Sequence, residues 1–97
     1  MIGVMTVAEA DDLTMSARLF AAMYSHSGAL VTESEAHSRL ASLQSGPWRI
    51  SELRMDGRQV GFALWVDLVE YVFIRSFAID PARRRAGMGR AFLSQLR

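Results

Sequence analysis

The chain has 97 residues, of which 51% are hydrophobic and 22% are charged, and its formal net charge is +1. This length predicts one domain, residues 1–97, with one core. The small net charge argues against a general nucleic-acid-binding protein, which usually carries a larger positive excess on one face. The absence of cysteine excludes disulfide bonds, thiolate metal sites and a cysteine nucleophile.

Three further features of the sequence narrow the class of protein. No apolar run approaches the roughly 20 residues needed to span a bilayer. The N-terminus lacks the basic region and apolar stretch of a signal peptide, so we expect a cytoplasmic protein. No cluster of His, Asp or Glu has metal-ligand spacing, so we expect no metal.

The first part of the chain predicts one strand and then a helix. Residues 2–7 are short and β-branched, as in a strand. Asp11 and Asp12 are helix-start residues. Apolar side chains then recur at three- and four-residue spacing as far as residues 27–28, which predicts an amphipathic helix. Its inner face would carry Met15, Leu19, Ala22, Met23 and His26.

A second helix is predicted from about residue 33. Thr32 and Glu35 fit a capping box, in which the threonine side chain accepts a hydrogen bond from the backbone N–H three residues on. The inner face of this helix would hold Ala36, Leu40 and Leu43. Gly46 would end it in the left-handed conformation, and Pro47 cannot continue it.

The chain then changes from helices to strands. Residues 48–55 predict a strand whose alternation slips in its middle, which suggests a bulge. Asp56 and Gly57 form a hairpin signal, because both tolerate positive φ. Residues 59–66 predict the partner strand, whose alternation sorts the side chains onto two faces. One face would carry Val60, Phe62, Leu64 and Val66, and the other Gly61, Ala63 and Trp65.

Residues 71–79 are nearly all apolar, apart from Arg75 and Ser76. A strand of that kind is usually covered on both faces, so we expect it to be central in the sheet. A last helix is predicted from about Gly87, and one side of it would carry Ala91, Phe92 and Leu96. The order β-α-α-β-β-β-α predicts an α+β fold, with helices packed on the faces of a mostly antiparallel sheet.

Residues 84–90 connect the last predicted strand to the last helix. Glycines at 87 and 89 would let the backbone approach a ligand closely, and the first turn of a helix offers unpaired N–H groups. Cations suited to phosphate oxygens come from Arg83, Arg84, Arg85 and Arg90. The alternatives are a tight turn and a solvated run of charge. The strand-loop-helix context favours a site for a phosphate or pyrophosphate.

Residues 77–90 resemble motif A of the GCN5-related N-acetyltransferase (GNAT) family. That signature is Gln or Arg, two residues, Gly, one residue, then Gly or Ala, and Arg84, Gly87 and Gly89 match it in place. The order of the elements and the position of the hairpin are also similar to the family's. The resemblance implies a GNAT-like fold and an acetyltransferase that moves an acetyl group from acetyl-CoA to a primary amine of a small molecule or a peptide.

The resemblance also implies how acetyl-CoA, the expected co-substrate, would bind. The pyrophosphate would be held around Arg84, Arg85, Ala86, Gly87, Met88, Gly89 and Arg90. The pantetheine arm would pair like an added strand with the backbone of Phe77, Ala78 and Ile79. An amide near Phe77 or Ala78 would then polarise the acetyl carbonyl.

The sequence assigns no catalytic residue. Glu70, expected at the start of the fourth strand, is a candidate general base, and an exposed carboxylate at a strand end is the alternative. Arg75, the one charge in that strand, would either reach an edge with its head group or pair with an acidic group of the acceptor.

A full member of the family continues beyond the third helix with a fifth strand, a fourth helix and further strands, whereas this chain stops at Arg97. The fourth strand would then have an apolar edge, which proteins usually pair or cover, so we expect a homodimer. Two other interpretations stay open. One is a non-catalytic module of the same fold that binds coenzyme A or dimerises, and the other is a nucleic-acid-associated protein that uses the arginines at 83–90.

Overall fold

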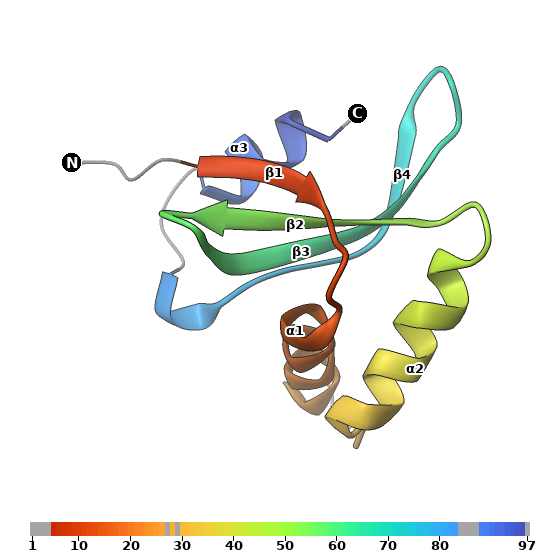
Figure 1. Ribbon diagram of the computed structural model, residues 1–97, viewed down its shortest axis with the longest axis vertical. Coiled ribbons are helices and arrows are strands. Elements are labelled where there is room, and N and C mark those ends of the chain that lie inside the picture. Colours follow the sequence, from red (N-terminus) through yellow and green to blue (C-terminus); the bar gives the residue numbers. More distant parts are fainter. Residues whose placement is uncertain (1–4, 27, 29, 84–87, 97) are drawn as a thin grey trace.

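The computed structural model describes residues 5–26, 28, 30–83 and 88–96. Its centre is a four-stranded antiparallel sheet in the order β1-β2-β3-β4. Figure 1 shows α1 and α2 against one face of this sheet and α3 against the other. The elements are β1 (Met5–Glu9), α1 (Thr14–His26), α2 (Glu33–Gln44), β2 (Arg49–Met55), β3 (Arg58–Asp67), β4 (Val72–Ile79), the 3-10 turn η1 (Pro81–Arg83) and α3 (Met88–Ser94). The predicted α+β class and element order are therefore confirmed.

The first helix starts beside Asp12, as the sequence predicts. The Asp12 carboxylate accepts hydrogen bonds from the Thr14 hydroxyl at 2.6 Å and from the Thr14 N–H at 2.9 Å. These bonds, the side-chain bond first, lower the pKa of the Asp12 carboxyl, because they favour its charged form. The helix ends at His26, and Gly28 follows it with a φ of +88°.

The buried face of α1 differs from the predicted one. Ala17 and Phe20 are buried, whereas Ala22 is exposed and Met15 and Met23 are only partly buried. The helix packs against both α2 and the sheet. The buried face of α1 is therefore wider than the single apolar stripe that the sequence predicted, and it is rotated around the helix axis relative to that stripe.

The two ends of α2 follow different rules. Thr32 caps the start as predicted, since its Oγ1 accepts a hydrogen bond from the Glu35 N–H at 3.0 Å. Ser45 is the C-cap, in the right-handed conformation with a φ of −73°. The predicted left-handed role of Gly46 is wrong, because its N–H donates to Leu43 O at 3.0 Å within a right-handed turn.

The β2–β3 hairpin turns at Asp56 and Gly57, whose φ angles are +54° and +80°. Positive φ at both residues is the signature of the two-residue hairpin turn that the sequence predicts. Beyond the turn, the register shifts so that Val60 has no partner on β2. This bulge turns Val60 toward α3, so the prediction that it shares a face with Phe62 is wrong.

Each face of the sheet has its own apolar core. Phe62 and Leu64 meet the buried side chains of α1 and α2, among them Leu40. On the other face, Ala63 and Trp65 belong to the core that α3 covers. That core is Leu53, Val60, Ala63, Trp65, Ile79, Phe92 and Leu96.

Within the described residues β4 is an edge strand, not the central strand that the sequence predicts. Its C-terminal half is nevertheless covered on both faces. Ile79 is buried in the core under α3, and Ala78 packs against the core under α1 and α2. The apolar sequence of this strand correctly predicted that both of its faces are covered. It carries no information on whether a further strand pairs with the outer edge of β4.

The close approach of β3 and β4 at Gly61 gives a first prediction. A Cβ atom at this position would lie 2.7 Å from Ile79 Cδ1 and 2.9 Å from the backbone oxygen of Ala78. Because a backbone oxygen cannot move aside alone, we expect Gly61→Ala to lower the free energy of unfolding in urea by about 1–3 kcal/mol.

Gly46→Ala is the matched control for this substitution. Its added Cβ would meet only Leu43 O, at 3.6 Å, which is an ordinary contact. Equal unfolding midpoints for the two variants would contradict the close packing of β4 on Gly61.

Candidate functional site

The edge of β4 that faces away from β3 presents backbone groups next to α3. The Asp80 N–H donates to Val60 O at 2.7 Å, and Ala78 pairs with Phe62. Since N–H groups point alternately to the two sides of an antiparallel strand, those of Phe77 and Ile79 point away from β3. Two N–H groups and two carbonyl oxygens therefore face the edge where no described strand lies.

A bulge at Arg75 changes the direction of side chains along β4. Leu64 pairs with Ser76 and Trp65 pairs with Ile74, so Arg75 has no partner on β3. Regular alternation would place Arg75 on the face of Phe77, which packs under α3. The bulge instead turns Arg75 to the face of α1 and α2, where it borders a pocket.

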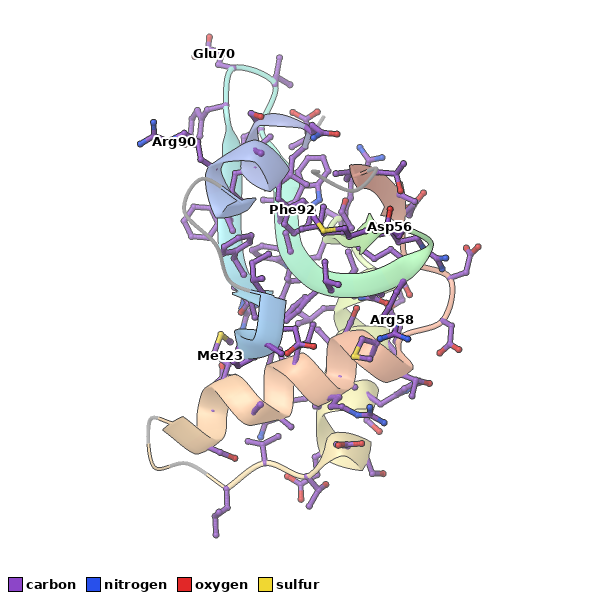
Figure 2. All side chains as sticks on the ribbon, turned by 90° about the vertical axis from the view of Figure 1, so that its left-hand side faces the viewer. Met23, Asp56, Arg58, Glu70, Arg90 and Phe92 are labelled. Carbon is purple, nitrogen blue, oxygen red and sulfur yellow. The ribbon has the colours of Figure 1, made fainter. Side chains whose placement is uncertain are left out.

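The start of α3 is fixed to β4 by aromatic packing. Phe92 is fully buried, and its ring centroid lies 5.5 Å from that of Phe77. A Cβ on Gly89 would lie 3.3 Å from Phe77 Cζ, so the glycine lets the helix backbone come close to the strand. Figure 2 shows Phe92 turned toward the sheet and Arg90 pointing away from it.

The structure covers only part of the predicted pyrophosphate loop. Arg84, Arg85, Ala86 and Gly87 lie outside the described residues. The flanking segments have the predicted arrangement, because β4 and the turn η1 precede the loop and α3 begins at Met88. The predicted binding residues thus divide between the end of β4, this loop and the first turn of α3.

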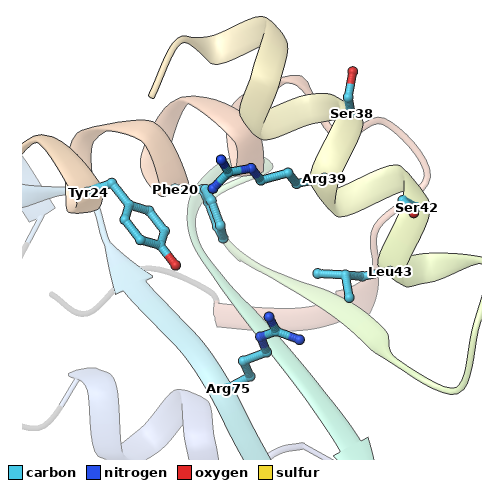
Figure 3. Close-up of a pocket in the computed structure, with 7 residues that line it drawn as sticks. All are labelled: Phe20, Tyr24, Ser38, Arg39, Ser42, Leu43 and Arg75. Atoms are coloured by element: carbon cyan, nitrogen blue, oxygen red, sulfur yellow. The ribbon is translucent and has the colours of Figure 1, made fainter. Parts of the chain in front are cut away.

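On the other side of β4, α1 and α2 border a pocket of about 410 Å³ (Figure 3). Its lining combines two cations, three hydroxyl groups and two apolar side chains. The lining residues are Phe20, Tyr24, Ser38, Arg39, Ser42, Leu43 and Arg75. Arg75 was a candidate binding residue from the sequence, whereas Arg39 was not predicted. The signal that could have found Arg39 is its spacing with Ser38 and Ser42, which puts all three on one side of α2.

Glu70 lies in the turn that joins β3 to β4, and its side chain is exposed. Its N–H donates to Leu68 O at 2.9 Å, and Asp67 supports the same turn by accepting from the Val69 N–H at 2.8 Å. Figure 2 shows Glu70 at the outer end of the hairpin. Its role as a general base stays a prediction.

The described part of the chain offers neither a cluster of metal ligands nor a membrane-spanning helix. No group of three or more His, Asp or Glu residues there could hold a metal ion. None of the described helices is both long enough and apolar enough to cross a membrane.

Comparison with known proteins finds likeness in structure only. No family model and no curated protein matches the sequence. A possible acetyltransferase from Clostridium difficile 630 superposes with a TM-score of 0.79 at 15% identity, over 94% of this chain and 67% of that one. A GNAT family acetyltransferase of Staphylococcus aureus gives a TM-score of 0.67 at 17% identity, over 97% and 74%.

A third structure, yncA of Salmonella typhimurium solved with its cofactor acetyl-CoA, gives a TM-score of 0.71 at 22% identity. The match covers 96% of this chain and 61% of that one. The chain has the fold of the GNAT acetyltransferases. It spans between 61% and 74% of the length of these three proteins.

The direction of the backbone groups in the GNAT-like strand β4 gives a second prediction. In amide hydrogen exchange of the unliganded protein, we expect the N–H of Ala78 to be protected by its pairing with β3. The N–H group of Phe77 should exchange much faster, because it points away from β3 to an edge where no described strand lies. The reverse order would mean that the register of β4 is shifted by one residue.

Proposed function

We propose that the protein is an acetyl-CoA-dependent N-acetyltransferase that moves an acetyl group to a primary amine. The observation that carries this proposal is the edge of β4 with which no described strand pairs, and which lies beside the first turn of α3. An extended ligand can add to such an edge as a strand does. Residues 1–97 would form the N-terminal portion of one acetyltransferase domain.

The two ends of acetyl-CoA would use different parts of this site. The pantetheine arm, with its two amides, would pair with the β4 backbone between Phe77 and Ile79, using the outward N–H and C=O groups of Phe77. The pyrophosphate would lie at residues 84–90, where Arg84, Arg85 and Arg90 supply positive charge. Gly89 supports this arrangement, because any side chain there would push α3 away from Phe77.

The outward N–H of Phe77 is suited to the reaction as well as to binding. Ala78 directs its own N–H to β3, so Phe77 is the one of the two candidates that would donate to the acetyl carbonyl oxygen. The amine nitrogen then attacks the carbonyl carbon, the carbon–sulfur bond breaks, and the thiolate takes a proton. Stabilising the oxyanion lowers the barrier to this attack.

The proton of the attacking ammonium group needs an acceptor. Val72 and Phe77 are separated by five steps along β4, which is roughly 16 Å at 3.3 Å per residue, and Glu70 lies beyond Val72 in the turn. A general base must lie within hydrogen-bond reach of the proton, directly or through one water. Water is therefore the proton acceptor that this geometry favours over Glu70.

The proposed location follows from the proposed co-substrate. Coenzyme A thioesters carry several negative charges, and charged molecules do not cross a bilayer without a carrier. An enzyme that consumes acetyl-CoA therefore works where the thioester is made, which favours the cytoplasm.

Thermal melting with acetyl-CoA tests the binding site. A ligand that binds only the folded state, at about a hundred times its dissociation constant, stabilises it by roughly 2.7 kcal/mol. We expect this shift in the unaltered protein, together with new exchange protection at Phe77. Gly87→Glu and Gly89→Glu should abolish both, because they add bulk and negative charge at the phosphate loop.

Gly46→Glu is the control, since it adds the same group in the turn after α2. The proposed binding of the pyrophosphate at this loop would be contradicted if Gly46→Glu lost the shift in melting temperature. It would also be contradicted if both loop variants kept that shift. Release of free thiol in the presence of an amine then separates an enzyme from a protein that only binds coenzyme A.

We also propose that a second copy of the chain covers the outer end of the β3–β4 hairpin. Val69, Tyr71 and Phe73 are 85%, 60% and 51% exposed there, which is unusual for large apolar side chains grouped together. This surface lies at the far end of β4 from Phe77 and leaves the proposed acetyl-CoA edge open. Figure 1 shows the hairpin extending beyond β2.

Sedimentation measures the proposed dimer directly. At micromolar concentration we expect a dimer, and we expect Val69→Ser combined with Tyr71→Ser to shift it to a monomer, because the variant removes apolar area from the contact. A strictly monomeric unaltered protein would overturn this part of the proposal.

A further inference from the structure

We propose that the acceptor amine carries an anionic group, a carboxylate or a phosphate, which Arg39 and Arg75 bind in the pocket between α1, α2 and β4. This inference rests on the proposed acetyl transfer, and it names the substrate class for it. Figure 3 shows the two arginines reaching the pocket from opposite sides, one from α2 and the other from β4.

Among the described residues, no ion pair balances the charge of the pocket. The ion pairs of the described residues are Arg18 with Glu33 and Arg54 with Glu52, so neither pocket arginine is neutralised in that part of the chain. The other lining residues add no carboxylate. Two cations that face one cavity repel each other, and an anion between them would relieve that repulsion while forming charge-assisted hydrogen bonds.

Arg75 is held in position before any ligand arrives. Its guanidinium carbon lies 5.3 Å from the centroid of the Trp48 ring, within the range of a cation–π contact. Phe73 supports Trp48 from the side, with ring centroids 6.2 Å apart in an edge-on arrangement. The bulge already directs Arg75 to this face. Binding of a ligand would therefore cost little conformational entropy of the Arg75 side chain.

Hydroxyl groups complete a site for oxyanions. Ser38 and Ser42 lie one turn apart on α2, and within the described chain neither hydroxyl is used in a hydrogen bond. The Tyr24 side chain points its hydroxyl into the same space (Figure 3). Hydroxyl donors beside guanidinium groups suit a carboxylate or a phosphate, and a neutral amine tail would leave the arginines without a partner.

The pocket has room for a small acceptor molecule. At about 30 Å³ per water-sized group, a volume of about 410 Å³ holds roughly a dozen non-hydrogen atoms. Arg75 precedes Phe77 by two residues, which is about 7 Å along a strand. An anion held at Arg75 would therefore place an amine a few bonds away beside the outward N–H of Phe77.

Matched pairs of amines test this inference through thiol release from acetyl-CoA. The pairs are β-alanine with its amide, and phosphoethanolamine with ethanolamine, so that the two arms distinguish carboxylate from phosphate. We expect the anionic member of at least one pair to react with a kcat/KM about 10- to 100-fold higher, which is the range for one or two charged hydrogen bonds. The difference should lie mainly in KM, because the anion is remote from the reacting carbon.

Arginine variants connect this preference to the pocket. Arg39→Gln and Arg75→Gln should each remove most of the preference, and Arg75→Lys should retain part of it, because it keeps the charge and loses the fork of donors. Arg58→Gln removes the same charge from an exposed position on β3 and should leave the preference unchanged. Raising the ionic strength to about 1 M, where the Debye length is about 3 Å, should reduce it in the unaltered protein.

A binding measurement keeps the result independent of turnover. In an NMR titration with phosphoethanolamine and then with β-alanine, the side-chain Nε–H signals of Arg39 and Arg75 should shift and that of Arg58 should not. If neither compound moves these signals, the anionic acceptor is excluded even if acetyl-CoA still raises the melting temperature. If the signals shift and acetyl-CoA has no effect on melting, the anion pocket stands and the acetyltransferase proposal fails.

Discussion

The pairing of β4 with β3 is the constraint on which the rest of the site depends. Gly61 allows the two strands to approach so closely that an added Cβ would meet the backbone of Ala78. The hydrogen bond from Asp80 to Val60 then fixes which groups of β4 face inward. Since the side-chain and N–H directions alternate strictly, this one register decides that Phe77 presents its amide to the free edge.

Two bulges modify that alternation, and both have consequences for the site. The bulge at Val60 gives the core under α3 one more apolar side chain, against which β4 and α3 pack. The bulge at Arg75 transfers a charge from the side of α3 to the side of α1 and α2. Without it, Arg75 would point toward the apolar core that holds Phe92, where an unpaired charge is costly.

Local chemistry explains what the sequence predicted well. The turn at Asp56 and Gly57 and the cap at Thr32 depend on residues within one turn of each other, and both were correct. The GNAT-like fold was predicted from the resemblance of residues 77–90 to motif A, and the order of these elements supported it. Arg39 was missed because its significance appears only when α2 packs beside β4, and the edge position of β4 depends on strand neighbours that no local pattern reports.

The distribution of charge explains how a nearly neutral chain can serve two anionic ligands. The formal net charge of +1 argues against a broad basic face, but it says nothing about where the charges lie. Arginines border the acceptor pocket on one side of β4 and the proposed pyrophosphate loop on the other, while acidic residues lie at the starts of α1 and α2. A single strand would thus separate the anionic ends of two substrates, whose uncharged reactive groups meet at its free edge.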